Sequence, residues 1–567
     1  MELIDQKTKK IMEECRVRAT AAGLQISGET LEYIVTNRDL LELSPKVMIP
    51  TLYDFWVNDA EAIGNKWIYG AYPHNPYETV INTRPAISFY NDNNPDWLNV
   101  MIFYHVLGHI DFFQNNATFK KTWDDDFSGQ ALADKRLLNR IREEMGAKKR
   151  WVDYVVEFAR SLDNLVGFHE ELEEADRNTL RSVLGTFSEK ANFYFGKFLK
   201  QRYDQKNVGL KFYHDEMERY NLCLKEFGQK LGEAAFFDDY KFKSKFPEFN
   251  SVFKKHQEKK EKAKKPKDIL QFLMENSAFI NKEENKWMKD VLQIVRRTSL
   301  FFQPQIRTKI CNEGWASLWH NKLFIVDEKM SGHEVDFARV NSGVLLDPKI
   351  GLNPYITGMR IFEFIEELAE KGKLSYEYQL LKDAEQRKRF DLKLGSEIGK
   401  KALFEARENL DDSLLINFLS DDDFQDFVDK HNLFIAGTRL NMEKEVVEVY
   451  IKSRDGKKYR KMLNKILYHP PYYTLSDEEG ELYFNHIFEG RALVTKYVPA
   501  VLRGLAYLWN GKIKLETTEF EKKPIMDLAQ LLMFQDGVEQ PESKKSRVLY
   551  TCEKNNVSRT VLDEGGK

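Results

Sequence analysis

The pattern of apolar and polar positions divides the chain into a long helical part and a shorter mixed part. In the N-terminal half, apolar residues such as Leu162, Leu165 and Leu172 recur at helical spacing. Residues 68–96 carry proline, glycine and asparagine between short β-branched runs, which predicts loops and two short strands. From about residue 405, short β-rich runs bounded by turns surround one helix-like stretch. The pattern predicts an α+β fold, with a predominantly α-helical N-terminal and central body and a smaller α+β C-terminal domain.

The same pattern predicts the boundaries of five segments. A lysine-dense run that includes Pro266 separates two helical regions and is interpreted as a solvated helix end or a linker, with a basic docking patch as the alternative. The polar C-terminus is interpreted as a ragged tail. The segments are a helical domain over 1–253, a Lys-rich linker over 254–267, a helical segment over 268–375, a smaller α+β domain over 376–530 and a polar tail over 531–567.

Composition and charge narrow the class of protein. Apolar residues make up 42% of the chain and charged residues 31%, as in an ordinary globular protein, and the net charge of -3 gives no reason to expect nucleic-acid or membrane binding. Cys15, Cys223, Cys311 and Cys552 lie far apart, which indicates a reducing compartment and argues against a cysteine-built metal site. The chain has no apolar run of about 18 residues and no signal-peptide core. We therefore expect a cytoplasmic protein without a membrane span.

A histidine pair in an apolar helix is the first candidate for chemistry. The Asn94-Pro95 step predicts the start of a helix that is apolar on every side and therefore buried. One turn separates His105 from His109, so both imidazoles lie on one face, about 6 Å apart, where they can converge on a single cation. Gly108 lacks a side chain, which allows another backbone or a ligand to approach closely.

Two observations weigh against a metalloprotease of the H-E-x-x-H type. Val106 stands where that motif has its glutamate base. Asp111 cannot replace the glutamate from the same helix, because two residues past His109 is about 200° around the axis. Buried histidines that only hydrogen-bond to their neighbours are the alternative interpretation.

A second aromatic-rich helix adds two more candidates. The sequence "NEGWASLWH", residues 312–320, contains Glu313 and His320 beside a wall of tryptophans. Seven residues rise about 10.5 Å along a helix, so we expect only one of the two to bind an ion that the histidine pair also binds. We predict that Glu313 is the third metal ligand and that His320 is a catalytic residue that transfers the proton. A buried salt bridge and a histidine at a helix end are the alternative.

Several blocks occur in an order that resembles the SpoVR family, stage V sporulation protein R. They are "YETVINTRPAISF", "GHIDFFQNN", "FFQPQIRTKICNEGWASLWH" and "GLNPYITG", and the resemblance runs from about residue 10 to residue 520. It implies a cytoplasmic bacterial protein, linked in spore formers to cortex formation, with a serine kinase and a von Willebrand-like protein as partners. It does not define a biochemical activity. The chain departs from the family pattern at Arg160, where relatives have a histidine. Some relatives also space the helix histidines by five residues, so that Tyr104 aligns with their first histidine.

Two functions remain open. The first is a metal-dependent hydrolase, with zinc as the expected ion, that acts on a peptide or amide bond such as those of cell-wall precursors, in spore-cortex formation or a stress response. The second is a non-catalytic regulatory or scaffold protein that works with the serine kinase and the von Willebrand-like partner. The chain has no G-x-x-x-x-G-K-[ST] phosphate loop, so a nucleotide-dependent reaction is not expected.

Overall fold

The computed structural model describes most of the chain. The described residues are 2–36, 78–83, 85–119, 127–162, 165, 188–199, 210–262, 268–348, 351–379, 381, 383–441, 446–467, 471–478, 480–488, 492–520 and 545–562.

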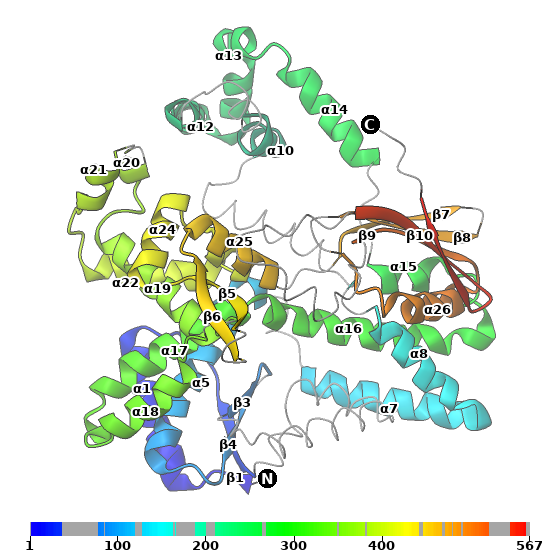
Figure 1. Ribbon diagram of the computed structural model, residues 1–567, viewed down its shortest axis with the longest axis horizontal. Coiled ribbons are helices and arrows are strands. Elements are labelled where there is room, and N and C mark those ends of the chain that lie inside the picture. Colours follow the sequence, from blue (N-terminus) through cyan, green and yellow to red (C-terminus); the bar gives the residue numbers. More distant parts are fainter. Residues whose placement is uncertain are drawn as a thin grey trace.

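The largest core lies in a helical body on one side of the molecule (Figure 1). Its central helix, α17, packs against α5 on one side and α19 on the other. Helix α1 covers α5, and α22 covers α19. The helices of this body are α1 (Gln6–Ala22), α5 (Asp96–Asn115), α17 (Lys309–Val326), α18 (Glu334–Val344), α19 (Pro354–Glu370), α20 (Tyr376–Gln379), α21 (Ala384–Arg389), α22 (Ser396–Asn409), α23 (Asp412–Asn417), α24 (Asp421–Lys430) and α25 (Gly456–Ile466).

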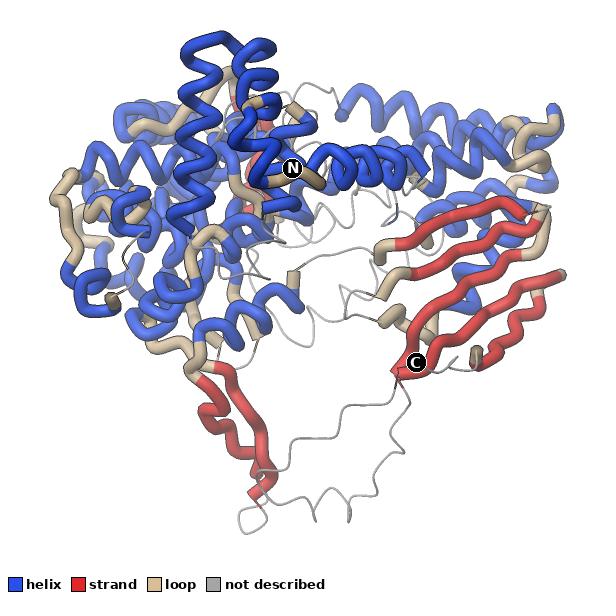
Figure 2. The backbone as a smooth tube through the Cα atoms, turned by 90° about the horizontal axis from the view of Figure 1, so that it is seen from above, coloured by secondary structure: helices blue, strands red, loops and turns tan. Residues whose placement is uncertain are grey.

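Two small sheets belong to the same body. A four-stranded sheet has the order β1-β2-β4-β3, in which only the β2–β4 pair is parallel. A two-stranded antiparallel hairpin, β5–β6, projects from the helices (Figure 2). The strands are β1 (Glu2–Leu3), β2 (Thr30–Val35), β3 (Glu78–Ile81), β4 (Ala86–Asn91), β5 (Ile435–Asn441) and β6 (Val446–Ser453).

The second core combines helices from the middle of the chain with a five-stranded C-terminal sheet of order β11-β10-β9-β8-β7. The β8–β9 pair is parallel, since α26 connects the two strands, and the other pairs are antiparallel. Figure 2 shows this sheet apart from the helical body. The elements are α7 (Phe127–Met145), α8 (Arg150–Arg160), α15 (Ile269–Asn276), α16 (Trp287–Arg307), α26 (Val498–Trp509), β7 (Tyr473–Glu478), β8 (Glu481–His486), β9 (Ile513–Phe520), β10 (Lys545–Glu553) and β11 (Asn556–Val561).

A third, smaller core is almost entirely aromatic. Tyr194 is fully buried and contacts seven phenylalanine rings of the described residues, among them Phe236, Phe242 and Phe249. Offset and edge-to-face contacts of this kind stabilise a core beyond the area they bury. The elements are α10 (Glu189–Phe193), the π-helical turn η4 (Tyr194–Phe198), α12 (Leu210–Asp238), α13 (Tyr240–Lys245) and α14 (Phe249–Lys262).

The predicted fold class is confirmed, because the body is mainly helical and the largest sheet is C-terminal. Among the helices that the structure describes, none combines the length and the apolar composition that a bilayer crossing requires. The predicted linker over 254–267 begins inside α14, and its residues 263–267 lie outside the described part of the chain.

The prediction of a polar tail over 531–567 is wrong for residues 545–561. These residues form β10 and β11, and β10 pairs with β9 along its length. Val548, Tyr550 and Cys552 alternate along β10 and are buried, whereas the residues between them are more exposed. This period-two pattern is the signal of a half-buried strand, and a polar overall composition conceals it.

Candidate metal centre

Helix α5 is buried along almost its whole length, as its apolar sequence predicts. Every residue from Leu98 to Phe113 is buried, including His105 and His109, which expose 4% and 5% of their surface. Gly108 allows α17 to pack directly on this helix, since a Cβ at Gly108 would lie 2.7 Å from the Cα of Ala316. The backbone of α17 therefore makes the close approach that the sequence predicted at Gly108.

Two further glycines fix the other side of α17. A Cβ at Gly314 would lie 2.4 Å from the backbone of Gly358 in α19, and a Cβ at Gly358 would lie 2.0 Å from the carbonyl oxygen of Ile310. Helices α5, α17 and α19 are therefore in backbone contact, and little freedom remains for α17 to move between them.

The first turn of α17 is capped by a distant carboxylate. No side chain of the helix caps its own N-terminus. Asp412 instead accepts hydrogen bonds from the backbone N–H groups of Ile310 at 3.0 Å and Cys311 at 2.8 Å. Because unsatisfied N–H groups at a helix start attract negative charge, this contact holds the turn that carries Glu313.

The three predicted ligands meet in one place. Oε2 of Glu313 lies 3.7 Å from Nε2 of His105 and 3.6 Å from Nε2 of His109. One ligand atom from each of the three residues lies within 4.8 Å of the other two. The two imidazole rings are perpendicular, with centroids 4.6 Å apart, so they approach a common point from different directions.

Hydrogen bonds on the far side of each ring orient the two histidines. Nδ1 of His109 lies 2.9 Å from Oδ1 of Asn312, and an amide oxygen only accepts, so Nδ1 carries the proton. Nδ1 of His105 lies 2.9 Å from Nδ1 of His320, whose Nε2 lies 2.8 Å from Oδ1 of Asn341. His320 therefore donates through Nε2 to Asn341 and accepts through Nδ1 from His105. In both His105 and His109, Nε2 is the nitrogen that faces Glu313.

Burial sets the charges of the cluster. Burial lowers the pKa of His320 to about 3, and burial together with the neighbouring His105 lowers the pKa of His109 to about 4. Both rings are therefore neutral at neutral pH. Burial alone would raise the pKa of Glu313, but the imidazoles of His105 and His109 lower it below the usual value, so this side chain is a carboxylate.

Asp111 lies on the other face of α5, as its position two residues past His109 predicts. It is fully buried and accepts hydrogen bonds from Nε1 of Trp315 at 2.9 Å and from the backbone of Gln25 at 2.6 Å, with Nε of Arg407 at 3.3 Å. Tyr104 also points away from the cluster and donates to Asp327. Neither residue contributes to the candidate site.

Three residues around the cluster were not predicted as site residues. Asn312 and Asn341 orient the histidines, and the ring of Tyr355 stacks on His105 with centroids 5.9 Å apart. Asn312 directly precedes Glu313, so its position beside a predicted ligand could have identified it as a site residue. Asn341 belongs to no motif, and its role depends on how α18 packs against α17.

Comparison with known proteins places the chain in a family. The family model described as "SpoVR like protein" matches residues 3–469, and the chain belongs to this family, as its sequence blocks indicate. The matched range ends before the C-terminal sheet. The uncharacterized protein YcgB of Escherichia coli (strain K12) is 23% identical over 522 residues, which cover 85% of this chain and 86% of that protein. No solved structure matches.

Proposed function

We propose that the protein is a metal-dependent hydrolase with zinc held by His105, His109 and Glu313. The observation that carries this proposal is the convergence of the three ligand atoms, with nitrogen–oxygen distances of 3.6 and 3.7 Å. Around a tetrahedral zinc with bonds of about 2.1 Å, ligand atoms lie about 3.4 Å apart. The two nitrogen–oxygen distances exceed this value by only a few tenths of an ångström, and all three ligand atoms lie within 4.8 Å of one another. Three protein ligands leave a fourth position for water or substrate, as in catalytic zinc sites.

The orientation of the histidines supports the same proposal. With Nδ1 of each ring donating to a neighbour, a neutral ring directs the lone pair of Nε2 toward Glu313. Two lone pairs and a carboxylate then converge in a buried place, which is unfavourable unless a cation lies between them. Metal-binding histidines commonly donate their other N–H in this manner, because the outer contact fixes both the tautomer and the ring orientation.

The roles of the surrounding residues follow from their contacts. A bound zinc would polarise a carbonyl and lower the pKa of a bound water. His320 is fully buried and uses both ring nitrogens on His105 and Asn341, so we assign it as a positioning residue in place of the proton transfer expected from the sequence. The cluster contains no second carboxylate among the described residues, and the proposal therefore assigns no protein general base.

Metal analysis of the purified protein tests the site. We expect about one zinc per chain in the wild type, and loss of the metal in the His105→Ala/His109→Ala double variant and in Glu313→Gln. His333→Ala is the matched control, since His333 stacks on Trp97 outside the cluster and should keep its metal content. A folded wild-type protein that binds no zinc, manganese, iron or cobalt on reconstitution would contradict the proposal.

The reaction class is tested separately from the metal. The amide or peptide substrate is proposed because a polarised carbonyl suits acyl transfer, and the link to the cell wall or cortex comes from the family. We expect the zinc-loaded wild type to cleave amide bonds of cell-wall stem peptides, whereas Glu313→Gln and the chelated protein should not. Zinc binding without cleavage would retain the site and reject the hydrolase.

Absence of metal would favour the scaffold alternative. Without a cation, the contacts of Glu313 with His105 and His109 would serve to dock α5 against α17. Function would then lie in contacts with the serine kinase and the von Willebrand-like protein expected from the family. A cytoplasmic location is part of both proposals and is supported by the four free cysteines.

A further inference from the structure

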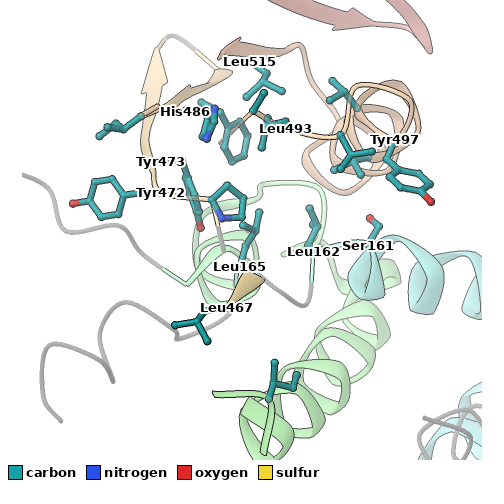
Figure 3. A pocket seen from close by; sticks show the side chains of 18 of the residues that line it. Ser161, Leu162, Leu165, Leu467, Tyr472, Tyr473, His486, Leu493, Tyr497 and Leu515 are labelled. Carbon is teal, nitrogen blue, oxygen red and sulfur yellow. The ribbon is translucent and has the colours of Figure 1, made fainter. Parts of the chain in front are cut away.

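A cavity of about 1240 Å³ lies between the helical body and the C-terminal sheet, and none of the three residues of the histidine cluster lines it. Its walls come from the end of α8, from α25 and α26, and from strands β7, β8 and β9. Figure 3 shows side chains from these elements and from the segments next to them, among them Leu162, Leu165, Leu493 and Leu515. The cavity exceeds the usual range of ligand pockets, about 300–1,000 Å³, so it has room for a large ligand.

The interior of the cavity suits a hydrocarbon chain. Leu502 and Leu505 of α26 and Phe484 of β8 continue the apolar lining deep in the second core. His486 also lies in the wall, but its Nδ1 is engaged by the hydroxyl of Thr517 at 2.8 Å. Apolar cavities are poorly hydrated and take up apolar ligands, so the lining favours an aliphatic body over a polar one.

The charges at the cavity are arranged unevenly. Asp411 is paired with Arg307 at 3.3 Å, and Asp412 is occupied by the backbone of α17, so these wall charges are satisfied within the protein. Lys461 and Lys465 line the α25 side and are exposed, and neither forms an ion pair with a carboxylate of the described residues. The remaining acidic wall residue, Glu157, belongs to α8. The α25 rim therefore offers positive charge to a ligand.

We propose that this cavity binds a single-chain amphiphile with an anionic head group, a carboxylate or a phosphate. The hydrocarbon chain lies among the leucines that follow α8 and those of α26 and β9, and the head group lies at Lys461 and Lys465. Exposed lysines attract an anion without fixing its geometry, which suits either head group. This inference does not depend on the metal site, because no ligand of the histidine cluster lines the cavity.

Binding of a fluorescent polyunsaturated fatty acid to the full chain tests the proposal, with palmitate, hexadecyl phosphate and hexadecyltrimethylammonium as competitors below their micellar concentrations. We expect saturable binding and displacement by the two anions, with the cation at least tenfold weaker. The Lys461→Gln/Lys465→Gln variant should bind the anions at least fivefold more weakly. Lys457→Gln/Lys458→Gln is the matched control on the same helix, outside the cavity, and should bind as the wild type does.

A variant that fills the cavity separates the interior from the rim. Leu493 lies half-buried in a loop, so Leu493→Trp should fill space without disturbing a packed core, and binding should be lost while the circular dichroism spectrum is unchanged. Leu515→Trp, in strand β9, repeats the test if the first variant does not fold. The proposal is overturned if the probe does not bind, if both head-group charges bind equally, or if a folded cavity-filling variant binds normally. Binding only to anionic vesicles would instead assign the lysines to a membrane surface and would also overturn it.

Discussion

The histidine cluster and the apolar cavity lie in cores that are built in opposite ways. Around the cluster, α5, α17 and α19 touch through their backbones at Gly108, Gly314 and Gly358, and the side chains between them are buried. Around the cavity, helices and strands from four regions of the chain meet without filling the space between them. Backbone contact fixes the positions of ligand atoms to within the tolerance that a metal ion requires. An open apolar space instead admits a flexible ligand whose shape is not fixed.

The largest expected difference between the two cores is in the free energy of unfolding that is lost when one large apolar residue is truncated in each. Phe362 is fully buried and packs edge-on against Trp315, with ring centroids 5.4 Å apart. We expect Phe362→Ala to lower the free energy of unfolding by about 4 kcal/mol, since the closely packed helices cannot collapse into the space left behind. Leu515→Ala should cost at most about 1 kcal/mol, because Leu515 is only partly buried and already faces the cavity. Urea unfolding measures both, and equal losses would refute the contrast in packing.

A methyl group at a helix contact tests the packing from the other direction. Gly358→Ala places a Cβ 2.0 Å from the carbonyl oxygen of Ile310, so α17 and α19 must separate. We expect a loss of about 3 kcal/mol, together with weaker zinc binding because α17 carries Glu313. Gly343→Ala is the control, since Gly343 lies in α18 with nothing within 4 Å of the added Cβ. This control should stabilise the protein by about 0.5 kcal/mol or more, and a loss in the control equal to that of Gly358→Ala would contradict the argument.

The sequence predicts the helices that carry the site better than it predicts how those helices pack against each other. The all-round apolar pattern of residues 97–113 predicts a buried helix, and the spacing of His105 and His109 predicts that they share a face, because both depend on local geometry alone. The approach of Glu313, some two hundred residues later, depends on α17 packing at Gly108. A glycine in a helix indicates such a contact but does not identify the partner helix.

Other features of the structure were not predicted from the sequence. Asn341 orients His320 only through the packing of α18 on α17, so no local pattern points to it. The apolar alternation of β10 was present, but its charged neighbours and the polar composition of the C-terminus suggested a tail. The cavity is lined by segments that are neighbours only in the folded protein, so neither periodicity nor spacing indicates it.

Asp412 belongs to both regions, since it lines the cavity and caps α17, and its titration gives the smallest expected effect. Burial raises the pKa of Asp412 from 3.8 to about 7. A raised pKa means that the folded state binds the proton more tightly than the unfolded state. The resulting stability is therefore present below pH 3.8 and is lost as the pH rises through about 7.

Comparing the pH dependence of the wild type with that of Asp412→Asn isolates this contribution. The free energy of unfolding of the wild type should fall by on the order of 2 kcal/mol more than that of the variant between pH 4 and pH 7. At pH 8, where the carboxylate is ionised, the variant should weaken one of the two contacts with the N–H groups of Ile310 and Cys311, because an amide has one acceptor oxygen. Asp422→Asn, an exposed acid in α24, should keep the slope of the wild type. Parallel curves for Asp412→Asn and the wild type would show that this carboxylate is ionised throughout, and that its charge holds α17 on the border between the two cores.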